Sequence, residues 1–291
     1  MSVDTLQDKI RKLKNPTMLE FCLSPADLPD AVQTEEGSAA AYRNFCRELL
    51  AQLKDTVPAV RVSFLSFALL GGAGMDALEN VLSYAKKLGY YVLLDAPELP
   101  SPQAASMTAE AFFGKECRFH CDGLIIGGYA GSDLIKPFLP YTVEGKKDLF
   151  VVARNANKSA PELQDLLAGG RLVHVAAADH VNRYGGDSMG KFGYSRVGIL
   201  TAASSAESLR SLRAKYPKLF FLMDGADYPN ANAKNCAQGF DKLGRGAVAI
   251  VGRSITCAWK NTESDGSDYL ACAQQAAERM KKNLNRYITI L

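Results

Sequence analysis

Eight short apolar segments recur along the chain, and segments long enough to form helices lie between them. Each short segment is apolar at nearly every position, which is the pattern of strands buried on both faces of a parallel sheet. The predicted strands are Thr17–Leu23, Ala59–Phe64, Tyr90–Asp95, Gly123–Gly127, Leu149–Arg154, Arg196–Thr201, Leu219–Met223 and Ala247–Val251.

The intervening segments carry apolar residues at helical spacing. They include Ala40–Leu53, Met75–Leu88, Ala206–Lys215 and Asp268–Leu284. Eight strands alternating with helices in a chain of 291 residues are typical of a TIM barrel. We therefore expect an α/β fold, a (β/α)8 barrel, with residues 1–291 as a single domain. A doubly wound open sheet is the alternative that the pattern leaves open. We interpret the glycine-rich stretch 71–74 as a turn, because no P-loop Lys-Ser/Thr follows it.

Composition excludes several classes of protein. Hydrophobic residues make up 47% of the chain and charged residues 22%, so it is globular and not disordered. No apolar run is long enough to span a membrane. The net charge of +3 is too small to indicate nucleic-acid binding, and we expect Lys281-Lys282 to form a solvated helix face. The N-terminus lacks the apolar core of a signal peptide, so a cytoplasmic location is expected.

The cysteine pattern indicates neither disulfides nor a metal site. The chain has seven cysteines, an odd number without paired spacing, and we interpret them as buried thiols. Cys117, His120 and Cys121 are ligand-type residues in one short loop with no partner pair elsewhere. We therefore expect no metal and no organic cofactor.

Candidate site residues follow from the fold, because TIM barrels bind ligands at the C-terminal ends of their strands. The Gly252-Arg253-Ser254 sequence after the eighth strand combines a glycine, a helix start and a cation, which suits a phosphate group. The candidates for ligand and phosphate binding are Arg154, Asn155, Asn157, Asp224, Asp227, Gly252, Arg253 and Ser254.

Two arginines end apolar runs. Arg61 and Arg154 must each either pair with a carboxylate or face a ligand. Asp95 and Asp224 are the candidate partners. The histidines carry no recognisable nucleophile beside them in the sequence, so they indicate no catalytic role.

Short sequences along the whole chain resemble the orotidine 5'-phosphate decarboxylase family in its longer bacterial form. The matching pieces, in order, are Asn15-Pro16-Thr17, Pro58-Ala59-Val60, Tyr84-Ala85-Lys86-Lys87-Leu88-Gly89, Leu94-Asp95-Ala96, Gly131-Ser132-Asp133, Pro137-Phe138-Leu139, Gly193-Tyr194-Ser195 and Gly252-Arg253-Ser254-Ile255. The resemblance implies a TIM barrel that forms homodimers with composite sites. It also implies conversion of orotidine monophosphate to uridine monophosphate without a cofactor, a step of pyrimidine biosynthesis.

The catalytic motif that the resemblance implies is incomplete here. The family places a Lys at the end of the second strand and an Asp-x-Lys-x-x-Asp motif after the third. This chain has Arg61 in the first Lys position, Pro97 in the second and Pro100 in the final Asp position, so Asp95 alone is retained. Proline offers no ionisable group, and arginine does not release a proton near neutral pH.

Three functions remain open at this stage. The chain is a family barrel that has lost decarboxylation and binds a phosphorylated small molecule through Arg253, or an active decarboxylase with a rearranged site. As the third alternative, it is a different enzyme that acts on a phosphorylated metabolite. We expect a homodimer, or a heterodimer with an intact paralogue, and no nucleic-acid or membrane partner.

Overall fold

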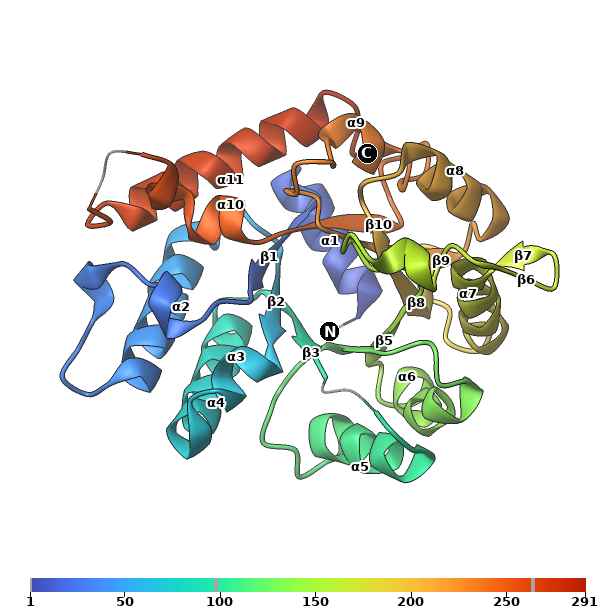
Figure 1. Ribbon diagram of the computed structural model, residues 1–291, viewed down its shortest axis with the longest axis horizontal. Coiled ribbons are helices and arrows are strands. Elements are labelled where there is room, and N and C mark those ends of the chain that lie inside the picture. The colour runs from blue at the N-terminus through green and yellow to red at the C-terminus, as the bar shows by residue number, and fades with distance from the viewer. Residues whose placement is uncertain (1, 97–98, 263–264) are drawn as a thin grey trace.

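The computed structural model describes residues 2–96, 99–262 and 265–291, and its centre is a closed barrel of parallel strands (Figure 1). Around the ring the strands follow the order β1-β10-β9-β8-β5-β4-β3-β2. The closed ring confirms the TIM barrel and excludes the open sheet. The barrel strands are β1 (Thr17–Phe21), β2 (Ala59–Ser63), β3 (Tyr91–Asp95), β4 (Gly123–Ile126), β5 (Asp148–Val152), β8 (Ser195–Ala202), β9 (Leu219–Asp224) and β10 (Ala247–Val251).

Helices surround the ring of strands (Figure 1). They are α1 (Val3–Leu13), α2 (Ser38–Leu53), α3 (Phe64–Ala68), α4 (Gly71–Lys87), α5 (Pro102–Phe113), α6 (Leu139–Val143), α7 (Val173–Tyr184), α8 (Ala206–Lys215), α9 (Ala233–Ala237), α10 (Arg253–Thr256) and α11 (Tyr269–Asn285). Short 3-10 turns are η1 (Pro25–Asp27), η2 (Asp30–Val32), η3 (Ser132–Leu134), η4 (Lys136–Phe138), η5 (Ala160–Glu162) and η6 (Ala258–Asn261). A small antiparallel hairpin, β6 (Leu167–Ala168) and β7 (Arg171–Leu172), projects from the barrel between β5 and α7.

The prediction of a turn at 71–74 is wrong, because these glycines form the first turn of α4. The reason is packing between α3 and α4. A Cβ atom on Gly74 would lie 1.9 Å from the carbonyl oxygen of Phe67, so only a residue without a side chain fits this approach.

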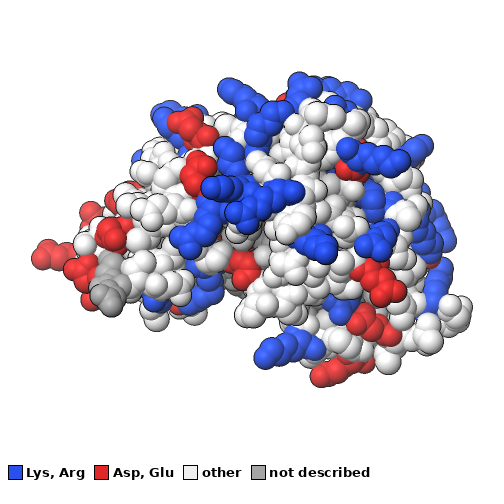
Figure 2. Space-filling model, turned by 90° about the horizontal axis from the view of Figure 1, so that it is seen from above, with Lys and Arg blue, Asp and Glu red and all other residues white. Residues whose placement is uncertain are grey.

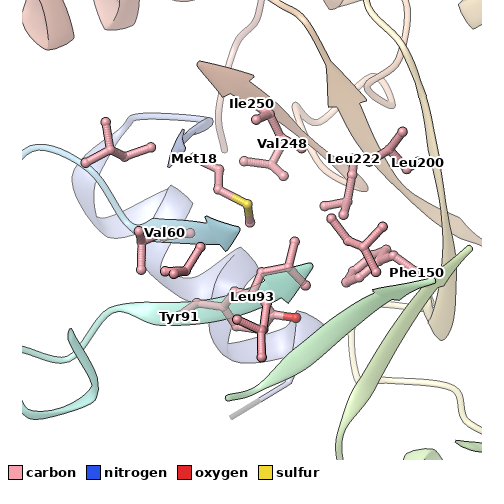
Figure 3. Packing of buried hydrophobic residues seen from close by; sticks show 14 of the residues in the cluster. Met18, Val60, Tyr91, Leu93, Phe150, Leu200, Leu222, Val248 and Ile250 are labelled. Atoms are coloured by element: carbon pink, nitrogen blue, oxygen red, sulfur yellow. The ribbon is translucent and has the colours of Figure 1, made fainter. Parts of the chain in front are cut away.

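The core fills the inside of the barrel and the layer between strands and helices. Met18, Leu93, Leu222 and Val248 come from four strands, and their side chains point toward a common centre (Figure 3). All four are fully buried. Such apolar filling makes the barrel a packed core, so a site is confined to its two ends.

The two ends of the barrel differ. Helix α1 crosses one end, where Gln7 Oε1 accepts a hydrogen bond of 3.1 Å from the backbone N–H of Gly246, just before β10. The opposite end, which we call the mouth, is formed by the C-terminal ends of the strands. The residues after β2, β3, β9 and β10 therefore meet at the mouth, as the sequence predicts.

The outer surface carries charges of both signs. Lys and Arg side chains gather on the face seen in Figure 2, along which α11 lies in Figure 1. Lys282 of α11 is exposed, as expected of a solvated helix face. None of the helices in the described ranges is both long and apolar enough to cross a membrane. The expectation that every cysteine is buried is wrong, because Cys22 after β1 is exposed and Cys117 and Cys272 are half-buried.

Candidate functional site

Arg61 occupies the centre of the mouth and binds three carboxylates. Its Nη1 atom lies 3.0 Å from Glu20 Oε1 and 2.7 Å from Asp224 Oδ1. Its Nη2 and Nε atoms lie 2.7 Å and 2.9 Å from Asp95 Oδ2. The register places Arg61 beside Glu20 on β1, while Asp95 and Asp224 end β3 and β9. We call these four residues the mouth cluster.

Burial and charge set the protonation of the mouth cluster. Burial raises the pKa of Glu20 to about 7; Arg61 opposes this rise, and Asp224 adds to it. Burial also raises the pKa of Asp95, again against the attraction of Arg61. Burial would lower the pKa of Arg61, but the three carboxylates raise it well above its ordinary value. Arg61 therefore stays charged and is no proton donor at neutral pH.

A small cavity lies beside the mouth cluster. Its volume is about 240 Å³, below the usual range for small-molecule sites of about 300–1,000 Å³. Arg61 and Asp95 form its charged side, and Tyr129 and Asn155 line it as well. The Tyr129 hydroxyl donates to the backbone carbonyl of Ala153. The cavity thus presents a guanidinium, a carboxylate, a phenol and amide groups among its apolar residues.

The residues after β10 that the sequence predicts to bind phosphate contact the chain's own carboxylates instead. Asp227 Oδ2 accepts hydrogen bonds from the backbone N–H groups of Gly252, at 3.0 Å, and Ser254, at 3.1 Å. The Arg253 Nη2 atom lies 2.5 Å from Asp27 Oδ1. The hydrogen bond from Arg253 holds the pKa of Asp27 well below its usual range, so this carboxylate is ionised. Two internal anions therefore occupy the positions expected for a bound one.

Arg154 does not join the mouth cluster, so the expected pairing with Asp95 or Asp224 is wrong for this residue. Its Nε and Nη2 atoms each lie 2.9 Å from an oxygen of Asp165, a bidentate pair. The loop after β5 folds back over the end of its own strand and brings Asp165 to Arg154. Asn155 lines the mouth cavity, whereas Asn157 is exposed and donates to Ser159.

Sequence reasoning did not single out three carboxylates that hold the site together. Glu20 is a charged residue in an otherwise apolar strand. The same pattern drew attention to Arg61, so it could also have identified Glu20. Asp27 is 226 residues away from Arg253 and lies in a polar loop, where no local pattern marks it. Asp165 likewise lies in a loop.

The chain is similar in sequence to curated orotidine 5'-phosphate decarboxylases, although no protein-family model matches it. The Clostridium perfringens (strain SM101 / Type A) enzyme is 29% identical over 245 residues, 84% of either chain. The Clostridium kluyveri enzyme is 27% identical over 288 residues, which cover 98% of this chain and 97% of that one.

Solved structures show the same fold. Leishmania donovani OMP decarboxylase matches with a TM-score of 0.77 and 22% identity, covering 99% of this chain and 98% of that one. The Plasmodium berghei orotidine 5'-monophosphate decarboxylase matches with a TM-score of 0.78 and 14% identity, covering 98% of each chain. This protein is thus similar over most of its length to curated orotidine 5'-phosphate decarboxylases, and it shares the barrel fold of the solved ones.

Proposed function

We propose that this chain is a barrel of the orotidine 5'-phosphate decarboxylase family that does not decarboxylate orotidine monophosphate. The observation that carries the proposal is the ion-pairing of Arg61 with three carboxylates at the centre of the mouth. Loss of carbon dioxide leaves negative charge on a ring carbon, which needs a nearby cation and then a proton. Arg61 is already neutralised, and its pKa is too high for proton donation.

The charge at the mouth also disfavours this substrate. Orotidine monophosphate carries a carboxylate and a phosphate, and it would meet Asp95, Asp224 and Asp227 with Arg61 as the central cation. Like charges in a partly buried site repel strongly because water screens them poorly. Pro97, in the family's second Lys position, lies outside the described residues. Pro100, in the final Asp position, has no ionisable group.

A turnover assay tests the proposal. The purified chain is incubated with orotidine monophosphate, and uridine monophosphate is quantified by chromatography. The Clostridium perfringens homologue, prepared in the same way, is the positive control. We expect product no higher than the buffer blank. Product formation that scales with the amount of this chain contradicts the proposal and supports the alternative, an active enzyme with a rearranged site that uses a lysine such as the exposed Lys158.

Binding of a phosphorylated small molecule is a second candidate function, and one observation favours it. Asp227 and Ser254 line a cavity of about 630 Å³ that is also lined by Lys234 and Arg286. A phosphate group that displaced Asp227 would gain the backbone N–H groups of Gly252 and Ser254 near these two cations. The same arrangement suits the third alternative, a different enzyme for a phosphorylated metabolite.

The partner proposals rest on the family resemblance and on exposed apolar residues next to the mouth. Leu65 of α3 and Leu69, which follows it, are each about two-thirds exposed. Large exposed apolar side chains at one place indicate a protein-protein contact. We propose a homodimer through this surface. A heterodimer with an intact paralogue would use the same surface.

A further inference from the structure

A third cavity lies between the loop after β5, helix α7 and helix α8. Its volume is about 400 Å³, within the usual range for small-molecule sites. Apolar side chains, serine hydroxyls, a histidine, an arginine and two carboxylates line it. The lining residues used below are Arg154, Asp165, His174, Glu207, Leu172 and Val175.

His174 lies at the buried side of this cavity and is held by two acceptors. Its Nδ1 atom is 2.9 Å from the backbone carbonyl oxygen of Gln164 and 3.2 Å from Asp165 Oδ1. The hydrogen bond from Arg154 lowers the pKa of Asp165, so this carboxylate is ionised and accepts. Because both neighbours accept hydrogen bonds, Nδ1 carries the proton. In the neutral ring, Nε2 is then a bare acceptor.

The guanidinium donors of Arg154, which lines the cavity, are already used. Arg154 gives Nε and Nη2 to Asp165, and its Nη1 lies 3.3 Å from the carbonyl oxygen of Asn155. Arg154 and Asp165 also cancel each other's charge. Among the described lining residues, no free cation is therefore left to attract an anion.

Glu207 gives the cavity a net negative charge. It lies in the first turn of α8 and is exposed, and no cation of the described residues pairs with it. The positive end of the α8 helix dipole stabilises this carboxylate. The side chain is exposed, so a ligand can still reach it. Leu172 and Val175 supply apolar surface to the same cavity.

We propose that this cavity binds a small organic amine, whose ammonium group lies against Glu207 and donates to His174 Nε2 while its apolar body packs on Leu172 and Val175. His174 Nε2 and Glu207 both accept hydrogen bonds, so they favour a ligand group that donates. The negative charge of Glu207 favours a donor that is positively charged. This site shares no lining residue with the mouth cluster or with the cavity beside it, so the inference does not depend on the proposed loss of decarboxylation.

Three probes of nearly equal shape test the class of ligand: phenethylamine, 2-phenylethanol and phenylacetate. Each is titrated at pH 8 into the ¹⁵N-labelled chain, and the imidazole nitrogen signals of His174 are followed by NMR. We expect saturable binding of the amine with a shift of the Nε2 signal, weaker binding of the alcohol and no binding of the acid. Equal or tighter binding of phenylacetate, or no saturation by the amine, overturns the proposal.

Two variants separate this site from binding elsewhere. Glu207→Gln keeps the shape of an exposed residue and should weaken amine binding about tenfold, since a hydrogen bond to a charged group is lost. Glu35→Gln, at another exposed glutamate, is the matched control and should leave amine binding unchanged. Amine binding that is unaltered in Glu207→Gln contradicts the proposed position of the ammonium group.

Discussion

Arg61 Nη1 and Asp224 Oδ1 lie 2.7 Å apart, although 163 residues separate them in the sequence. Arg61 is on β2 and Asp224 ends β9, and these strands are not neighbours in the ring. The ion pair therefore crosses the mouth of the barrel. The sequence predicts Arg61 at the end of an apolar run, whereas the structure places it in the middle of β2, and the closed ring brings it to Asp224 at the end of β9.

Replacing Arg61 tests how far the mouth cluster depends on its cation. Arg61→Met leaves Glu20, Asp95 and Asp224 partly buried without a positive partner. We expect the free energy of unfolding at neutral pH to fall by about 3–5 kcal/mol, the usual result of breaking a buried ion pair. Chemical denaturation followed by circular dichroism measures this change.

Arg43→Met is the control for that experiment. Arg43 pairs with Glu36 on the surface at 3.3 Å, and the loss of an exposed pair costs about 0–1 kcal/mol. Similar losses of stability in the two variants would show that Arg61 is not the specific support of the mouth.

Glu20 should make the folded state less stable as the pH rises. Its pKa in the folded state is about 7, against an ordinary value of about 4.5, so the folded chain keeps a proton that the unfolded chain has lost. Stability from this group is complete below about pH 4.5 and is lost as the pH passes through 7. The loss amounts to at most about 3 kcal/mol.

Glu20→Gln removes this titration and nearly preserves the shape of the side chain. The stability of the variant relative to the wild type should therefore rise between pH 4.5 and pH 8, as measured by urea denaturation at each pH. Glu35→Gln, an exposed replacement of the same kind, is the reference. A difference between Glu20→Gln and wild type that stays constant over this range would be evidence against a proton on Glu20.

Asp227 should compete with phosphate for the backbone N–H groups of Gly252 and Ser254. Asp227→Ala removes the internal carboxylate, so we expect uridine monophosphate to bind at least about tenfold more tightly in isothermal titration calorimetry. Asp187→Ala, at an exposed aspartate, should leave the affinity unchanged. Weaker binding by Asp227→Ala than by wild type would mean that Asp227 assists the ligand instead of replacing it.

The exposed leucines beside the mouth should carry the contact between subunits. Leu65 is 66% exposed and Leu69 is 67% exposed, and replacing both by Asp should convert a dimer into a monomer in sedimentation velocity. Leu167→Asp, on the hairpin and 75% exposed, is the matched control and should leave the dimer intact. A wild-type chain that sediments as a monomer would rule out the homodimer.

The sequence predicted the barrel well because each strand is buried on both faces, which makes its apolar run hard to mistake. It placed Ala247–Val251 with the same limits that the structure has. It also named Asp95 and Asp224 as partners of Arg61, because charged residues at strand ends of a parallel barrel share one end.

Contacts formed by loops were harder to predict. Asp165 reaches Arg154 because the segment after β5 turns back over its own strand, and Asp27 reaches Arg253 across nearly the whole sequence. Neither contact follows from periodicity. The glycines at 71–74 misled for a similar reason: their role depends on the neighbouring helix α3 and not on their own stretch of chain.

The close approach at Gly74 links an outer helix to the mouth. Helix α3 begins at Phe64, directly after β2 ends at Ser63, and the carbonyl of Phe67 in α3 lies where a side chain at position 74 would have to go. A single added methyl group there would force the two helices apart. A position on α4, a helix that contributes no residue to the mouth cluster, thus limits where α3 can lie directly after β2, the strand that carries Arg61.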